Sequence, residues 1–153
     1  MTTSSRFVRF LPILGLVALA SACSKPEPCQ AIPDSEESKA LGVVLDGGRL
    51  CKDDSGVFNI DYEKSVDEVQ SAYLSTLKGN GWKGEQVSEG PNGGSLFFDN
   101  GEQKMLVTVL KNGDRNVTVA IIKHCMVAGA PKDHPVIKSC LEDTQKLADA
   151  LKK

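Results

Sequence analysis

The clearest helical pattern in the chain begins just after residue 65. Its apolar positions recur at the spacing of one helix face: Val66, Val69, Tyr73 and Leu77, with Ala72 beside them. Ser65 and Glu68 have the spacing of a capping box, which satisfies two backbone donors at a helix start. Gly79 and Gly81 end the pattern, since glycine readily adopts the left-handed C-terminal conformation. The sequence therefore predicts a helix over 65–79, and Trp82, the chain's single tryptophan, is expected to fold back on its apolar side.

From residue 95 onward, apolar residues alternate with polar ones at a period of two. Segments 95–98, 105–110 and 117–122 show this alternation. The dipeptides Asn-Gly at 100–101 and 112–113 separate them, and such dipeptides favour tight hairpin turns. An earlier segment, 56–62, alternates in the same way. The pattern predicts an antiparallel sheet that contains a three-strand meander.

A second helical pattern occupies the end of the chain, at about 132–152. Asp133 is a suitable cap and Pro135 suits a first helical turn. One side of this helix is apolar: Val136, Ile137, Cys140, Leu141, Leu147, Ala148 and Leu151. Packing on its own domain is favoured over docking a partner. The expected fold class is α+β, with the capped helix and this C-terminal helix packed on the antiparallel sheet of a domain at 41–153.

The start of the chain has the pattern of an export signal. Arg6 and Arg9 precede an apolar run over 10–19, and the small residues Ala20-Ser21-Ala22 follow it. The apolar run has about half of the ~20 residues that a membrane-spanning helix needs. A cleaved signal over 1–22 is therefore expected, after which 131 of the 153 residues remain, enough for one domain.

Cys23 directly follows these small residues, and the segment resembles a bacterial lipobox. The resemblance implies that a diacylglycerol is attached to the Cys23 thiol, that cleavage follows Ala22, and that the new amine receives a further acyl chain such as palmitate. Leu19 lies one place earlier than the family prefers. Ser24 in place of Asp implies sorting to the outer membrane, on its periplasmic or surface face. A plain secretory signal is the alternative, since Ala20-Ser21-Ala22 also fits ordinary cleavage.

The segment 23–40 has the composition of a lipidated tether, with several prolines and an acidic run. Such a composition does not bury enough apolar surface to fold alone. The signal contains two arginines and no acids, so the mature chain has 16 cations against 20 anions. A mildly acidic domain has no electrostatic basis for binding nucleic acid.

Four further cysteines remain: Cys29, Cys51, Cys125 and Cys140. An even number in an exported chain predicts two disulfides. The local pairing, Cys29–Cys51 with Cys125–Cys140, is favoured, while a crossed pairing that joins the two ends of the domain stays open. His124 and His134 lie near two of the cysteines, but no C-x-x-C pair occurs, so neither a zinc site nor a thiol oxidoreductase is expected.

The middle of the chain resembles small α+β modules of bacterial envelope lipoproteins, in a helix-grip-like arrangement. The resemblance rests on the aromatic strand Phe58-Asn59-Ile60-Asp61-Tyr62, the helix start Ser65-Val66-Asp67-Glu68-Val69, Tyr73, and Leu77-Lys78-Gly79-Asn80-Gly81-Trp82. These residues are caps, core and turns. The resemblance therefore implies a fold and no active site.

Nothing in the sequence has the pattern of a catalytic centre. His124 and His134 are each expected to be a surface or capping histidine, and the paired carboxylates fall in loops or on a solvated helix face. We therefore expect a non-enzymatic envelope binding or assembly module with a protein partner and with no cofactor beyond the lipid on Cys23. An inhibitor or immunity protein against a toxin or cell-wall hydrolase is one alternative. A small-ligand carrier or hydrolase with a pocket between sheet and helices is the other.

Overall fold

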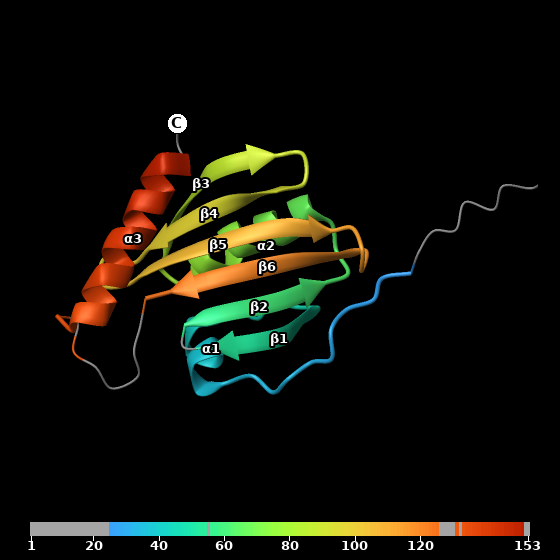
Figure 1. The fold of residues 1–153 in the computed structure, drawn as a ribbon, viewed down its shortest axis with the longest axis horizontal. Helices are drawn as coiled ribbons and strands as arrows, with labels where there is room; N and C mark the ends of the chain where they lie inside the picture. Colours follow the sequence, from blue (N-terminus) through green and yellow to red (C-terminus); the bar gives the residue numbers. More distant parts are fainter. Residues whose placement is uncertain (1–24, 55, 126–130, 132, 152–153) are drawn as a thin grey trace, which may run out of the picture.

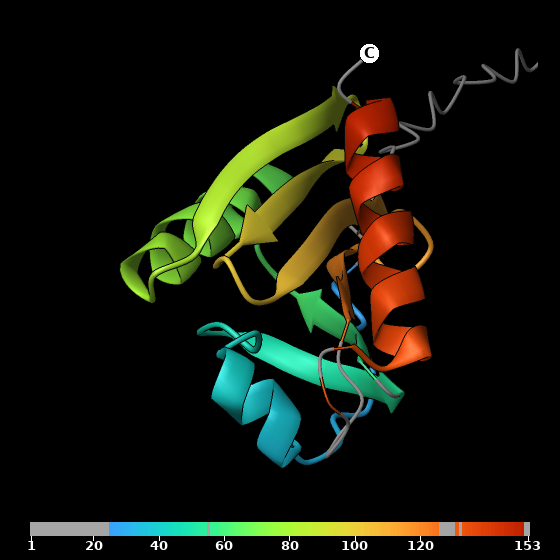
Figure 2. The ribbon, with the colours of Figure 1, turned by 90° about the vertical axis from the view of Figure 1, so that its left-hand side faces the viewer.

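The computed structural model describes residues 25–54, 56–125, 131 and 133–151. Within them the strands are β1 (Gly48–Asp54), β2 (Val57–Tyr62), β3 (Lys83–Gly90), β4 (Gly93–Asp99), β5 (Lys104–Asn112) and β6 (Val117–His124), and the helices are α1 (Glu36–Leu41), α2 (Val66–Gly79) and α3 (Pro135–Leu151). The strands form one antiparallel sheet in the order β1-β2-β6-β5-β4-β3. Helix α2 covers one face and α3 crosses the other (Figures 1 and 2). The predicted α+β class is confirmed.

The predicted capped helix is present as α2. The Ser65 hydroxyl accepts from the Glu68 amide at 3.3 Å, and the Glu68 carboxylate accepts from the Ser65 amide at 2.8 Å. The buried side of α2 packs on the main core cluster through Val69, Tyr73 and Leu77. Trp82 joins this cluster, and its amide donates to the Leu77 carbonyl at 3.0 Å. Both expectations for this segment are confirmed.

The predicted meander is also present, as β4, β5 and β6. Gly101, in the turn between β4 and β5, has a φ of +89°, which glycine adopts without steric cost. Strand β2 pairs with β6, so the early part of the chain extends the meander on that side. The edge strands β1 and β3 were not predicted. Each contains a register shift, near Cys51 in β1 and near Val87 in β3, which breaks the alternation of apolar positions.

Helix α3 packs on its own domain, as favoured. It crosses the face of the sheet opposite α2. It lies over the end of the sheet where β3 and β5 begin (Figure 2). A second, smaller apolar cluster lies in this part of the molecule, formed by Val87, Phe97 and Leu106. Lys104 donates to the Gln145 side chain of α3 at 2.9 Å. No helix of the described residues is long and apolar enough to cross a membrane.

The boundary expected between a tether and a domain at residues 40 and 41 falls inside helix α1 and is corrected. The Ser35 hydroxyl caps this helix by accepting from the Ser38 amide at 3.0 Å. Ser38 and Leu41 are buried, and Leu41 belongs to the main core. Because the helix is short and mostly polar, the local cap is not enough to stabilise it, and it depends on contacts with distant parts of the chain.

Candidate functional site

The face of the sheet opposite α2 is only partly covered. Helix α3 crosses the sheet at one end of the strands. The chain before α1 runs along the edge of the sheet formed by β1 (Figures 1 and 2). Between them lies a surface that we call the open face, formed by Asn59, Thr108, Leu110, Val119 and Ile121, with the buried Ser95 beside Thr108. The pairing registers place these side chains on one face, since Asn59 and Thr108 both lie opposite Ile121, and Leu110 lies opposite Val119.

The open face combines exposed aliphatic side chains with short polar ones. Leu110 is 40% exposed and Ile121 is 37% exposed, so this face keeps apolar area in contact with solvent. The Ser95 hydroxyl shares a hydrogen bond of 3.1 Å with the Thr108 hydroxyl. A serine paired with a threonine lacks the general base that activates a nucleophile.

A second feature is the segment 25–34, which we call the strap. Its Glu27 amide donates to the Arg115 carbonyl at 2.8 Å, and its Ile32 amide donates to the Leu50 carbonyl at 2.8 Å. Between these points Cys29 forms a disulfide with Cys51 of β1. The strap is therefore fastened to the sheet at three places.

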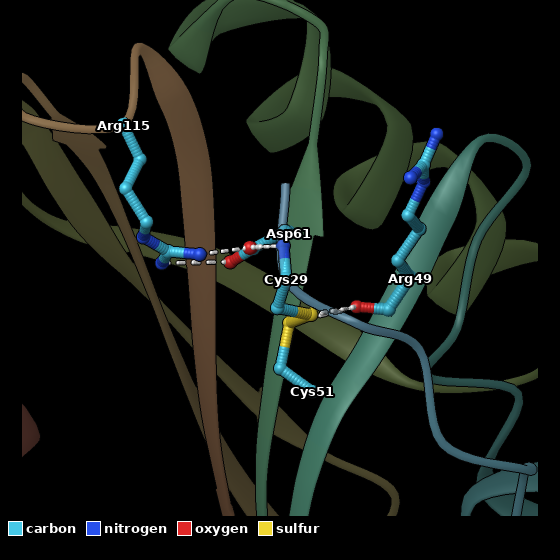
Figure 3. The surroundings of a disulfide bond; sticks show 5 residues. All are labelled: Cys29, Arg49, Cys51, Asp61 and Arg115. Carbon is cyan, nitrogen blue, oxygen red and sulfur yellow. Dashed lines mark hydrogen bonds and ion pairs between the residues drawn. A yellow bond between two sulfur atoms is a disulfide. The ribbon is translucent and has the colours of Figure 1, made fainter. Parts of the chain in front are cut away.

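The strap, β2 and the β5–β6 turn meet at Asp61 (Figure 3). The Asp61 carboxyl is 1% exposed; one oxygen accepts from the Cys29 amide at 2.7 Å and from the Arg115 guanidinium, and the other accepts from Arg115 at 3.2 Å. A buried carboxylate is strongly destabilising unless it is paired and hydrogen-bonded. Here both conditions are met by groups distant in the sequence.

Cys29, Cys51 and Asp61 also place three potential metal-ligand atoms within 4.8 Å of one another. However, both sulfurs belong to a disulfide, so neither is available as a thiolate. The Asp61 oxygens already accept hydrogen bonds from Cys29 and Arg115. The arrangement therefore acts as a structural fastening in the oxidised protein.

The second disulfide joins Cys125, just after β6, to Cys140 of α3. The Cys125 sulfur also lies 3.2 Å from the buried Thr144 hydroxyl of the same helix. Both disulfides follow the favoured local pairing, and the crossed pairing is not observed. Ala22 and Cys23, the expected cleavage and lipidation residues, lie outside the described residues.

His124 was expected to be a surface or capping histidine, and the surface position is wrong. His124 is only 2% exposed. Its Nδ1 atom lies 3.2 Å from the carboxylate of Glu37 in α1, and its ring centre lies 6.5 Å from the ring centre of Trp82. Burial lowers the pKa of His124, although the Glu37 carboxylate opposes this effect. We infer that neutral His124 donates its Nδ1 proton to Glu37. Nε2 then remains an acceptor, for which the described residues provide no partner. His134 is half-buried just before α3.

An open hollow of about 550 Å³ lies near the ends of β3 and β4. Its lining combines charged and aromatic side chains with bare backbone: Gly81, Lys83, Gly84, Glu85, Phe97, Asp99, Asn100 and Gly101. A hydrogen bond from the Gly101 amide, supported by Lys104, lowers the pKa of Asp99. Asp99 is therefore kept ionised and is unsuited to act as a general acid near neutral pH.

Comparison with known proteins adds no evidence about the family or function of this protein. No family model matches the chain, and neither a curated protein nor a solved structure matches it. The resemblance to bacterial lipoproteins therefore rests on the motif residues around Cys23 and in α2, and functional inference rests on the sequence and the geometry described above.

The buried ion pair predicts a large effect of removing Arg115. Arg115→Met leaves the buried Asp61 carboxylate without its cation, and we expect a loss of about 3 kcal/mol in unfolding free energy, since Arg115 itself is partly exposed. Arg49→Met is the matched control, because Arg49 pairs with Glu63 at the surface and such pairs contribute about 1 kcal/mol or less. Urea unfolding of the oxidised proteins measures both. Equal losses would contradict the structural importance of the Asp61 pair.

The buried His124 predicts a dependence of stability on pH. Its pKa is lower in the folded state than its ordinary value of 6.5, so the unfolded state binds the proton first as the pH falls. Unfolding free energy should therefore decrease as the pH falls through about 6.5, and His124→Gln should remove this part of the dependence. His134→Gln is the control and should retain it. Urea unfolding at pH values on both sides of this window provides the test, and identical profiles for the two variants would refute the prediction.

Proposed function

We propose that the protein is a lipid-anchored bacterial envelope lipoprotein that binds another envelope protein and has no enzymatic activity of its own. The feature that carries this proposal is Cys23, which follows a basic segment, an apolar run and Ala20-Ser21-Ala22. The two disulfides support export independently, because such bonds persist in oxidising compartments. Ser24 favours the outer membrane, on its periplasmic or surface side.

The open face is the surface that we assign to the protein partner. Leu110 and Ile121 offer exposed apolar area beside the short polar side chains of Asn59 and Thr108. Protein interfaces commonly place aliphatic contacts among polar groups in this way. Because the face lies on regular strands, it is presented without the entropy cost of ordering a loop.

Packing between α2 and the sheet favours a binding module over a carrier. Tyr73 is fully buried in this layer, and its hydroxyl lies 2.9 Å from the Tyr62 hydroxyl and donates to the Val43 carbonyl at 2.8 Å. A ligand in this position would have to displace side chains that are already packed and hydrogen-bonded. An inhibitor or immunity protein would use the same open face, so the identity of the partner distinguishes the two binding functions.

Lipid attachment at Cys23 is directly testable. Cells that express the full chain and are fed a labelled palmitate analogue should yield labelled protein in the membrane fraction, whereas Cys23→Ala should abolish both the label and the processing, because the lipid is joined to this thiol. Ser24→Ala is the matched control and should keep the label. Retention of the palmitate label by Cys23→Ala would refute the anchor.

The partner surface is tested by photo-crosslinking in intact cells. A photoreactive amino acid at Ile121 or Leu110 should yield a discrete protein adduct, because these side chains are exposed on the open face. The control position is Ser71, which is exposed on α2 on the opposite side of the sheet. Mass spectrometry of the adduct identifies the partner. Adducts from Ser71 alone, or a small molecule as the crosslinked species, would contradict the assignment.

A further inference from the structure

The strap determines which end of the sheet lies close to Cys23. Its Glu27 amide is held by the carbonyl of Arg115 in the β5–β6 turn. We call this end of the strands the near end. The opposite end, which we call the far end, carries the β4–β5 turn, His124 and helix α1 (Figure 1). The strap runs from the near end toward the far end.

Covalent geometry limits how far Cys23 lies from the near end. Cys23 precedes Glu27 by four residues, so the two Cα atoms lie within about 14 Å of each other even in a fully extended chain. Strand β5, with nine residues, extends roughly 27 Å along the sheet. A lipid on Cys23 is therefore within reach of the near end and out of reach of the far end.

The fastening of the strap prevents a longer reach. Suppose that the chain were free as far as Ser35, at the start of α1. Ser35 is the twelfth residue after Cys23, so the free segment could span up to about 40 Å. That length exceeds the extent of β5 and would allow any orientation. The Cys29–Cys51 disulfide and the Cys29 contact with buried Asp61 oppose such release.

The chemistry of the near end suits contact with lipid headgroups. Exposed polar residues occupy its turns, among them Asn92 and Asp114. Lys64 pairs with Asp46 at 3.7 Å beside the same end. Polar and mixed charges of this kind favour a position on the headgroup surface and oppose insertion into the hydrocarbon core.

We propose that the near end faces the lipid surface, with the strands upright on the membrane and the far end directed away from it. This inference rests on the proposed lipid at Cys23. It places the open face on the side of the upright domain, so that a partner approaches it along the membrane surface. The strap, and not a charged patch, sets this orientation.

A quenching experiment on the mature lipoprotein tests the orientation. The protein is reconstituted in phosphatidylethanolamine and phosphatidylglycerol vesicles that carry a headgroup nitroxide, which quenches only nearby fluorophores. The same fluorescent amino acid replaces either Asp114 at the near end or Ala40 in α1 at the far end, both of which are exposed. Quenching is expected to be several-fold stronger at Asp114.

The matched control is an insertion of about twelve Gly and Ser residues after Lys25, which adds roughly 20 Å of flexible reach and leaves every strap contact intact. It should make quenching at the two positions nearly equal. Protein that does not float with the vesicles would overturn the lipid anchor and this orientation with it. Protein that floats but is quenched equally at Asp114 and Ala40 without the insertion would overturn the orientation alone.

Discussion

The pairing of buried Asp61 with Arg115 is the interaction on which the arrangement of the strap depends. It joins residues 54 positions apart, and the same carboxylate accepts the amide hydrogen of Cys29. One side chain thus connects the strap, a central strand and a turn. Because an unpaired carboxylate is so costly in this environment, the three segments are stable there only together. The nearby Cys29–Cys51 disulfide adds a covalent link between the strap and β1.

Much of the fold follows from local patterns, and the exceptions have identifiable physical causes. The capping box of α2 and the Asn-Gly turn at 100–101 act over a few residues, so their effects were predictable. Strand β3 has Val87 as its one buried residue and lies at an edge of the sheet, where its neighbour β4 supplies most of the burial. Its pairing is a tertiary effect that overrides weak local preference. The same applies to α1, for which Ser35 at the N-cap is a local signal.

The site was less predictable because it depends on contacts between distant segments. Alternation placed Asp61 on the polar side of β2, which is correct, but the strap that buries this side chain has no regular pattern. His124 is buried by Glu37 and Trp82, which lie far away in the sequence. The exposed Leu110 and Ile121 look like ordinary strand residues in the sequence. Only the folded structure shows that they are left exposed.

The pairing of β2 with β6 has a consequence for the order in which the chain folds. The disulfides close short segments of 22 and 15 residues, whereas β2 reaches β6 across α2 and the whole β3–β5 region. Closing such a distant contact costs more chain entropy than forming the hairpins between β4, β5 and β6. We therefore expect the meander to assemble first and β1, β2 and the strap to dock last. The strap, which lies near the start of the chain and is synthesised early, is then among the last parts to become ordered.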